Sequence, residues 1–536
     1  MSIPFIEDND QTRARHEHLE AVRELVGNAY PNKFERSQII EQGKEDTITA
    51  VVAKFHAFEP KAEEGQRPPQ EAIELANRQL SDKTVRLAGR IATPPRVMGK
   101  AAFVHLSDGV TRLQIYVRKG DAKAINNATG AVIDDEVSGW KLLELFDHGD
   151  FIGVEGNLFI TKTGELSVHV RTMQFLSKAL LPLPDKMHGI NDPELRRRQR
   201  YADLIAGSLK LERDDEELTP RAVFELRSAV IRELRRILDD HGYIEVETPM
   251  LTPLATGAAA RPFETYHNAL GIPLYARIAP ELYLKRLLVG GFEKVYELNR
   301  NFRNEGISAK HNPEFTMLEF YWAYADVNQM MDFCEQMMRA TVFTALGHTH
   351  AKFGEIDLDF SQPFERLTMK ESVAQFAPEE TVTDDNMLEL FERHVEEKLV
   401  QPTLITNFPK RISPLSKASP RDPSIAERFE LFIAGMECAN GFSELNDPRE
   451  QYERFNDQMS ARESGDDEAM LMDEDYIRAL SYGMPPAAGI GIGIDRFVML
   501  LANRQSIRDV ILFPHLRPER KHGDAEQGDE STDDHG

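Results

Sequence analysis

The spacing of apolar residues changes twice along this chain of 536 residues. Near the N-terminus, apolar side chains recur at helical intervals over residues 12–26, which predicts an amphipathic helix. From residue 83 to residue 177, apolar and polar positions alternate in short runs, a pattern typical of strands. From residue 220 onward, helical patterns and buried strands are mixed, which predicts one large α+β domain.

The alternating region predicts five strands, with helical sequence at residues 141–146 between the third and the fourth. The strands begin at Val85, Ala102, Leu113, Phe151 and Leu166. Five short strands in about 95 residues favour a small barrel of the OB type, and a fragment of a β-sandwich is the alternative.

The α+β region opens with a strong amphipathic helix over residues 221–241, which Gly242 ends. A short strand follows and stops at Pro249. Further helices are expected at 328–346 and 386–399, and buried strands at 428–434 and 489–494. Together with the barrel, the predicted fold class is α+β, with a catalytic domain built on an antiparallel sheet flanked by helices.

Polar segments separate these regions. Residues 59–82 are polar and could carry a short helix at 72–79, and residues 180–203 contain three prolines typical of a linker. The linker also holds four arginines, Arg196, Arg197, Arg198 and Arg200, which form either a solvated face or a contact for a long polyanion. We therefore expect an N-terminal extension at 1–82, the barrel at 83–178, a linker at 179–215, the large domain at 216–518 and a disordered acidic tail at 519–536.

Composition narrows the class of protein. Hydrophobic residues make up 41% and charged residues 29%, and no apolar run is long enough to cross a bilayer, so we expect a cytoplasmic protein without a membrane partner. The formal net charge of −25 argues against nucleic-acid binding over the whole surface, although a local basic groove remains possible. Two cysteines exclude a disulfide framework and a cysteine-based zinc site. His348 and His350 could bind a metal, but such a pair more often faces solvent without a ligand.

The stretch 295–322 is the most informative one. It predicts two strands joined by a polar loop, and alternation along the second strand gives Phe315, Met317, Glu319 and Tyr321 one shared face. A buried Glu319 without a partner would be costly, and a cationic ligand would relieve that cost. This face therefore favours ligand binding.

A cluster of carboxylates follows in residues 428–447, where Glu430, Glu437 and Glu444 surround Asn440 and Phe442. Carboxylates beside a polyphosphate are a natural site for Mg²⁺, which prefers hard oxygen ligands. Glu430 and Glu437 are seven positions apart and would face opposite ways in a regular strand. We therefore expect a β-bulge, placed at Gly435.

Alternating glycines mark the segment 489–501. Their spacing, G-x-G-x-G, allows close approach to the backbone, but it differs from the G-x-G-x-x-G pattern of dinucleotide-binding folds. We expect Asp495 to be the N-cap of the helix that follows, with Arg496 at a helix N-terminus that favours anions.

These segments resemble the signature motifs of class II aminoacyl-tRNA synthetases. The helix and strand ending at Pro249 resemble the first motif, FRNEGISAKHNPEFTMLEFY the second and GIGIDRFVML the third. The segments ATGAAARPFET, NGFSELND and SIRDVILFP resemble those of the lysine-specific bacterial members. The resemblance covers roughly residues 10–518. The resemblance implies a homodimer that activates L-lysine with ATP, releases pyrophosphate and transfers lysine to tRNA(Lys), with the barrel binding the anticodon.

The resemblance also implies a role for individual residues. Arg303 and Arg496 are the expected catalytic residues. The expected ATP contacts are Arg303, Glu305, His311, Phe315, Glu437 and Arg496. The expected lysine contacts are Gly257, Glu281, Glu319, Tyr321, Asn440, Phe442 and Glu444. Glu430 and Glu437 would bind Mg²⁺, and Phe103 and Gln114 would contact anticodon bases.

Three rival interpretations share parts of this pattern. Glu281 and Glu444 argue against a synthetase for aspartate or asparagine, because an acidic substrate would need Arg or Lys at these positions. An enzyme that lysylates a protein would lack the barrel, and a non-catalytic RNA-binding relative would not need Arg303 and Arg496. Compared with the family, residues 376–402 are short, which affects local surface contacts rather than the chemistry. Pro94-Pro95 interrupts a barrel segment that is more basic in the family, so we expect a different affinity for the anticodon arm.

Overall fold

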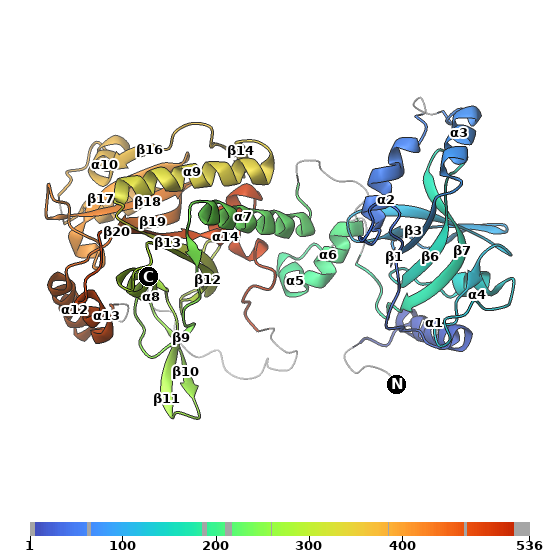
Figure 1. Ribbon diagram of the computed structural model, residues 1–536, viewed down its shortest axis with the longest axis horizontal. Coiled ribbons are helices and arrows are strands. Elements are labelled where there is room, and N and C mark those ends of the chain that lie inside the picture. The colour runs from blue at the N-terminus through green and yellow to red at the C-terminus, as the bar shows by residue number, and fades with distance from the viewer. Residues whose placement is uncertain are drawn as a thin grey trace. The chain divides into compact units, whose positions relative to one another are not determined.

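The computed structural model describes residues 6–61, 66–184, 190–209, 217–258, 260–383, 385–465 and 469–518. The chain divides into two compact units, residues 1–220 and 221–536 (Figure 1). The tail predicted to be disordered, residues 519–536, lies outside the described residues.

A closed barrel forms the centre of the first unit. Its strands pair in the order β1-β6-β7-β4-β3, and β3 pairs again with β1, which closes the barrel. The bounds are β1 (Thr84–Ile91), β3 (Ala101–Ser107), β4 (Arg112–Arg118), β6 (Phe151–Ile160) and β7 (Leu166–Ser177), with short β2 (Arg96–Met98) on β3 and β5 (Lys123–Ala124) on β7. The predicted five-stranded OB-type barrel is confirmed by this closure, and alternate residues of β1 and β3 fill its core.

The first unit also contains helices. They are α1 (Asp10–Val26), α2 (Ile48–Phe55), α3 (Gln70–Leu80), α4 (Ser138–Glu144), α5 (Pro193–Arg198) and α6 (Arg200–Leu209), with a 3-10 turn η1 (His56–Phe58). The last two α-helices were not expected, since the three prolines of residues 180–203 suggested only a linker. Asp192 caps α5 and Pro193 occupies its first turn, where a proline is compatible with a helix.

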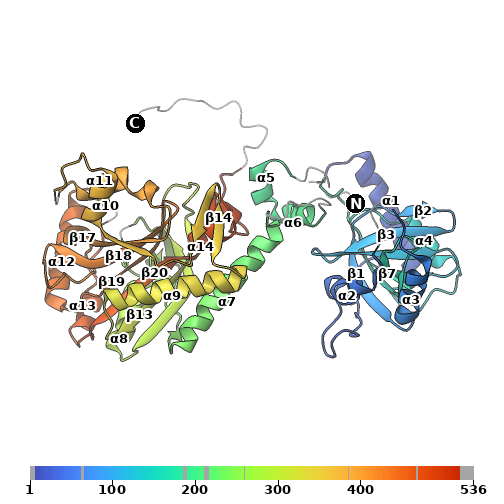
Figure 2. The same ribbon diagram turned by 90° about the horizontal axis from the view of Figure 1, so that it is seen from above.

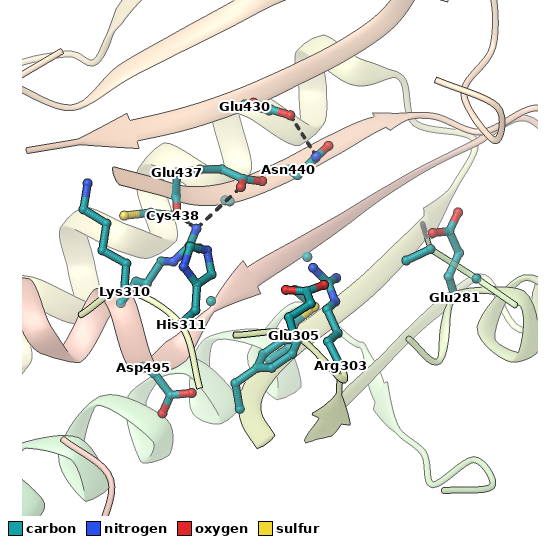
Figure 3. Close-up of a pocket in the computed structure, with 18 of the residues that line it drawn as sticks. Glu281, Arg303, Glu305, Lys310, His311, Glu430, Glu437, Cys438, Asn440 and Asp495 are labelled. Carbon is teal, nitrogen blue, oxygen red and sulfur yellow. Dashed lines mark hydrogen bonds and ion pairs between the residues drawn. The ribbon is translucent and has the colours of Figure 1, made fainter. Parts of the chain in front are cut away.

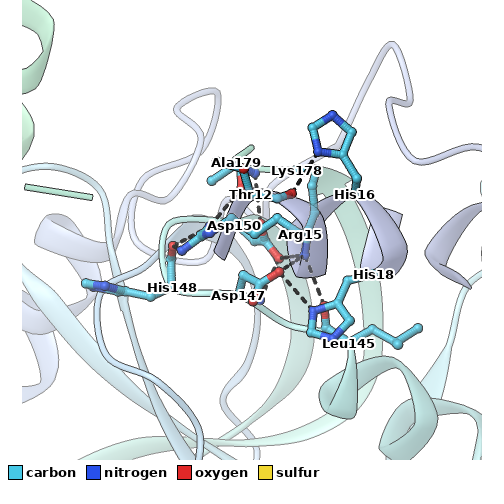
Figure 4. A network of polar contacts seen from close by, with 10 residues as sticks. All are labelled: Thr12, Arg15, His16, His18, Leu145, Asp147, His148, Asp150, Lys178 and Ala179. Carbon is cyan, nitrogen blue, oxygen red and sulfur yellow. Dashed lines mark hydrogen bonds and ion pairs between the residues drawn. The ribbon is translucent and has the colours of Figure 1, made fainter. Parts of the chain in front are cut away.

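A buried ion-pair network fixes α1 to the end of the barrel (Figure 4). The ammonium of Lys178 lies 2.6 Å from Asp147 and 2.8 Å from Asp150, and His18 from α1 approaches Asp147 at 3.0 Å. Arg15 donates to the carbonyl of Ala179 at 2.7 Å. Because Lys178 and Asp150 are fully buried and paired, removal of either would leave an uncompensated charge.

The second unit is built on an eight-stranded sheet in the order β16-β17-β18-β19-β20-β13-β12-β8. The bounds are β8 (Ile244–Glu245), β12 (Lys294–Phe302), β13 (Glu314–Ala323), β16 (Glu365–Thr368), β17 (Thr403–Pro409), β18 (Ile425–Ile433), β19 (Met436–Ser443) and β20 (Ala487–Gly493). All pairs are antiparallel except β12 with β8 and β16 with β17. The α+β prediction with an antiparallel catalytic sheet is confirmed.

Two long helices, α7 (Pro220–Asp240) and α9 (Val327–Leu346), lie side by side in both views (Figures 1 and 2). Phe333 of α9 packs against Phe320 and Trp322, so this face of β13 belongs to the core, as its alternation predicts. The remaining helices are α8 (Glu281–Val289), α10 (Met369–Phe376), α11 (Met387–His394), α12 (Pro448–Glu463), α13 (Glu474–Leu480) and α14 (Ile494–Leu501), with 3-10 turns η2 (Glu396–Lys398), η3 (Lys410–Ile412) and η4 (Ile507–Asp509).

Smaller strands complete this unit: β9 (Leu251–Thr252), β10 (Phe263–His267) and β11 (Ile272–Ala276) form one sheet, and β14 (His350–Phe353) pairs with β15 (Ile356–Asp359). Two expected elements are shorter than predicted. The strand expected before Pro249 is only β8, and the helix expected at 386–399 ends at His394 and continues as η2.

Candidate functional site

The register of the large sheet brings distant residues onto one face. Across β18, β19, β20 and β13, one row of paired positions is Glu430, Asn440, Gly491 and Glu319. The neighbouring row is Arg428, Phe442, Gly489 and Tyr321. Because directly paired residues point to the same side of a sheet, both rows belong to one surface.

Glu437 lies on this surface because it pairs with Phe432, two residues after Glu430 on β18. Leu431 then pairs with Ala439, so Cys438 is an extra residue on β19 and forms a β-bulge. The bulge keeps Asn440 opposite Glu430 and on the same face as Glu437. A bulge was expected, but its predicted position at Gly435 is wrong, since Gly435 and Ala434 form the tight turn between β18 and β19.

A cavity of about 440 Å³ lies over this surface, and eleven of the residues expected to contact ligands line it (Figure 3). They are Gly257, Glu281, Arg303, Glu305, His311, Phe315, Glu430, Glu437, Asn440, Phe442 and Arg496. Figure 3 shows Glu281 at one end of the cavity, with Lys310, His311 and Glu437 at the other. Lys310, Arg428 and Cys438 also line it and were not assigned a role from the sequence.

Two guanidinium groups point into the cavity region from different elements. Arg303 lies 5.1 Å from the centre of the Phe315 ring, and its buried Nε has no hydrogen-bond partner among the described residues. Arg496 donates to the Glu437 carbonyl at 2.6 Å, and its other nitrogen lies 3.1 Å from Nε2 of His311. Burial and the nearby Arg496 lower the pKa of His311, so its ring stays neutral near neutral pH. The cavity therefore favours an anionic ligand at this end.

Asp495 has a different role from the one expected. The N-cap of α14 is Gly493, and the Asp495 carboxylate instead accepts from Arg227 at 2.6 Å and from the backbone N–H of Thr316 at 2.7 Å. These contacts join α7 and β13 to the first turn of α14. Asp495 thereby fixes the helix turn that carries Arg496.

Glu430 and Glu437 form an acidic pair suited to a hard cation. The buried Glu430 carboxylate accepts from Arg428 at 2.5 Å and from Asn440 at 3.0 Å. Burial, followed by repulsion from Glu437, raises the pKa of Glu430 to about 8. Among the described residues, no group of three or more His, Cys, Asp or Glu could hold a metal by itself. A divalent ion here would complete its shell with water and ligand oxygens, as Mg²⁺ usually does.

The other end of the cavity is acidic and lies on buried carboxylates. Glu281 lines the cavity, whereas Glu319, Tyr321 and Glu444 do not line it and are buried in the surface described above. Tyr321 donates to Glu319 at 3.3 Å, and burial raises the pKa of Glu319 to about 8. A cationic ligand would relieve the burial cost of these carboxylates.

The alternating glycines make this packing possible. A Cβ on Gly489 would lie 2.3 Å from a carboxylate oxygen of Glu444 and 2.4 Å from the Tyr321 ring. A Cβ on Gly491 would lie 3.3 Å from the sulfur of Met317. The close approach predicted from the G-x-G-x-G spacing is confirmed.

A second candidate surface lies on the barrel. Phe103, Tyr116, Phe159 and His169 form an aromatic cluster on four strands, with ring centres 5.1 to 6.0 Å apart. Gln114 lies beside them, where it donates to Glu165 at 2.7 Å and accepts from Ser167 at 3.0 Å. The family resemblance singled out Phe103 and Gln114 only, although alternation along the strand would also have placed Tyr116 on the face of Gln114.

Two family models match this chain, one over each candidate surface. Residues 193–517 match the family of class II tRNA synthetases (D, K and N). The chain belongs to this synthetase family. Residues 85–176 of the synthetase match the OB-fold nucleic acid binding domain of the tRNA anticodon type, in agreement with the barrel.

Three similar proteins carry the name lysine–tRNA ligase. The one from Idiomarina loihiensis is 45% identical over 96% of this chain and 98% of its own length. Those from Yersinia enterocolitica and Coxiella burnetii are 46% and 47% identical, each over 95% of this chain and over 97% and 98% of their own lengths. Among the described residues of the synthetase, no helix is both long and apolar enough to span a membrane.

Proposed function

We propose that this synthetase is a lysine–tRNA ligase. It activates L-lysine with ATP to lysyl-adenylate, releases pyrophosphate and transfers lysine to the 3′ end of tRNA(Lys). The observation that carries the assignment is the acidic end of the cavity, where Glu281, Glu319 and Glu444 gather beside a site rich in guanidinium groups. A substrate with two ammonium groups and one carboxylate matches that distribution of charge.

The anion-binding end would hold ATP. Arg303 contacts both the α-phosphate and the lysine carboxylate, and its unpartnered Nε supports that role. Glu305 and His311 contact the nucleotide, while the adenine stacks on Phe315 under Arg496. The neutral His311 ring can donate or accept without adding charge beside the phosphates.

Glu430 and Glu437 would hold Mg²⁺, whose charge offsets that of the departing pyrophosphate. Both carboxylates lie on one face because Glu437 pairs with Phe432, two residues after Glu430, and their mutual repulsion favours a cation between them. Arg428 and Asn440 bind one oxygen of Glu430 and so orient its carboxylate.

The acidic end would hold the amino acid. Gly257 and Glu281 receive the α-ammonium, and Tyr321 and Glu444 receive the ε-ammonium with Glu319 nearby. Asn440 and Phe442 line the space for the aliphatic chain. A lysine carboxylate oxygen then attacks the α-phosphorus in line with the departing pyrophosphate, so catalysis needs orientation and charge neutralisation rather than a covalent nucleophile.

The barrel would bind the anticodon. Phe103 stacks on a base and Gln114 reads one by hydrogen bonding, and the aromatic neighbours of Phe103 extend the stacking surface. Gln114 is already bonded to Glu165 and Ser167, so a base must share or replace one of these bonds. The domain limits predicted from the sequence, and the function of the barrel as a separate anticodon domain, are part of this proposal.

A homodimer and a cytoplasmic location complete the proposal. Ile244, Met250 and Leu251 are exposed apolar residues around the first motif, which supports a second copy packing there. Light scattering of the purified protein tests the homodimer, and a monomer at micromolar concentration contradicts it.

The deciding experiment is ATP–pyrophosphate exchange with each of the twenty amino acids. We expect exchange with lysine alone, because Glu281 and Glu444 need ammonium partners. Exchange with aspartate or asparagine in place of lysine would assign the chain to another specificity of the same family.

A further inference from the structure

Lys285 lies between the two carboxylates that the proposed function gives to the ends of lysine. It belongs to α8, its side chain is fully buried, and its Nζ is 2.6 Å from Glu281 and 2.5 Å from Glu444. The same ammonium lies 5.3 Å from the ring centre of Phe442, another residue of the cavity. The protein thus holds an amino group of its own against the amino-acid site.

The ammonium of Lys285 stays charged. Burial lowers its pKa, but the two carboxylates raise it more strongly, so the net pKa is above the usual lysine value. Two other titratable groups nearby, Tyr476 and Arg286, do not supply this positive charge to Glu281 and Glu444. Tyr476 is a buried phenol, and the adjacent Arg286 is directed to Asp473 at 2.8 Å and to Asp475 at 3.3 Å.

The charges at this end of the cavity do not balance. Glu281 and Glu444 share the single ammonium of Lys285, and Glu319 receives a hydrogen bond only from Tyr321 among the described residues. The neighbouring Glu297 is paired with Arg277 at 2.6 Å and contributes no excess negative charge. With all three site carboxylates ionised, two negative charges remain without a counter-ion.

We propose that Lys285 is a positioning residue that sets amino-acid specificity: its ammonium holds Glu281 and Glu444 in place and, once Glu319 ionises on substrate binding, leaves an excess of two negative charges, which matches a diamino acid. This inference rests on the proposed lysine site. The excess equals the charge of the two ammonium groups of such a substrate, whose own carboxylate is proposed to pair with Arg303. An amino acid with a neutral side chain leaves one buried carboxylate unpaired.

Loss of Lys285 has a specific consequence. Glu281 and Glu444 would lose their shared counter-ion, and one of them would take up a proton or turn away, because buried like charges are costly. A protonated carboxyl is a weaker partner for an ammonium group. Lysine binding should therefore weaken while the nucleotide end of the cavity is unchanged.

The test compares Lys285→Met with Lys285→Arg and with Arg286→Met, the matched control on the same helix. Arg286 also pairs with carboxylates, but Asp473 and Asp475 do not line the cavity. In exchange assays we expect Lys285→Met to raise KM for lysine about tenfold or more, with KM for ATP unchanged. Lys285→Arg should restore part of the loss, and Arg286→Met should lower Tm without changing KM for lysine.

A folded Lys285→Met protein with the wild-type KM for lysine overturns the inference, as does an equal rise in both KM values. Wild-type protein assayed in parallel separates the two proposals. Absence of lysine-dependent exchange in the wild type refutes the proposed function, whereas normal exchange in both proteins refutes only the role of Lys285.

If Lys285→Met does not fold, the test uses Lys285→Ala, purified and assayed in the presence of n-propylammonium. This cation replaces the deleted ammonium and methylene groups, and n-propanol is the neutral control of similar shape. We expect KM for lysine to recover with n-propylammonium only. An equal response to both compounds, or to neither, overturns the inference.

Discussion

Replacement of Gly489 by alanine probes the packing under the amino-acid end of the cavity. The new Cβ would lie 2.3 Å from the Glu444 carboxylate and 2.4 Å from the Tyr321 ring, so both side chains must move by about 1 Å to reach normal contact. Overpacking of this kind costs about 1–3 kcal/mol, and a misplacement of about 1 Å can cost about 10²-fold in activity. We expect KM for lysine to rise about 10- to 100-fold, since each 1.4 kcal/mol corresponds to a factor of about ten.

Gly493→Ala is the matched control on the same strand. Its Cβ would meet no atom closer than 3.7 Å, which is ordinary contact, and its neighbours are the Cys438 carbonyl and Arg496 rather than the amino-acid site. Exchange is measured with lysine varied at saturating ATP, and thermal unfolding confirms that each variant is folded. A wild-type KM for lysine in Gly489→Ala, or an equal increase in Gly493→Ala, would refute the packing argument.

Three further predictions follow from the site. Glu437→Ala should abolish lysine-dependent exchange because half of the acidic pair is lost, and near wild-type exchange in that variant contradicts the metal site. Phe103→Ala should leave exchange intact but weaken tRNA charging by about 1–3 kcal/mol of base stacking, and an equal loss of both activities in a folded variant contradicts the barrel assignment. Burial raises the pKa of Glu319 to about 8, so this carboxyl is largely protonated at pH 7 in the free protein and must ionise to pair with lysine. Lysine binding should therefore release protons between pH 6 and 8 and tighten as pH rises, and calorimetry in two buffers that shows no proton release contradicts this.

Much of the fold was predictable because its elements bury one face. The barrel strands alternate, and α7 and α9 carry apolar stripes, so their periods are visible in the sequence. The turn between β18 and β19 is different, because it consists of Ala434 and Gly435 between two buried strands. Without a polar loop, the sequence gives no sign of where the chain reverses, and the bulge was therefore assigned to the wrong residue.

The residues of the cavity were predictable where they belong to sequence motifs, but their ion-pair partners were not. Asp495 was expected to cap a helix because aspartate favours that position, whereas its carboxylate pairs with Arg227 from a distant helix. Lys285 was not singled out because lysine is usually solvated, and its partner Glu444 is remote in sequence. The i, i+4 spacing of Glu281 and Lys285 was the one local signal available.

The tight turn between β18 and β19 makes this hairpin sensitive to the parity of its length. Deletion of one residue between Glu430 and the turn would move Glu437 to the face opposite Glu430, in the layer covered by α9, and bring an apolar neighbour to the nucleotide side. Removal of two residues would keep the alternation and shorten the hairpin only. Natural or engineered variants of this segment should therefore tolerate changes in length by pairs of residues better than single insertions or deletions.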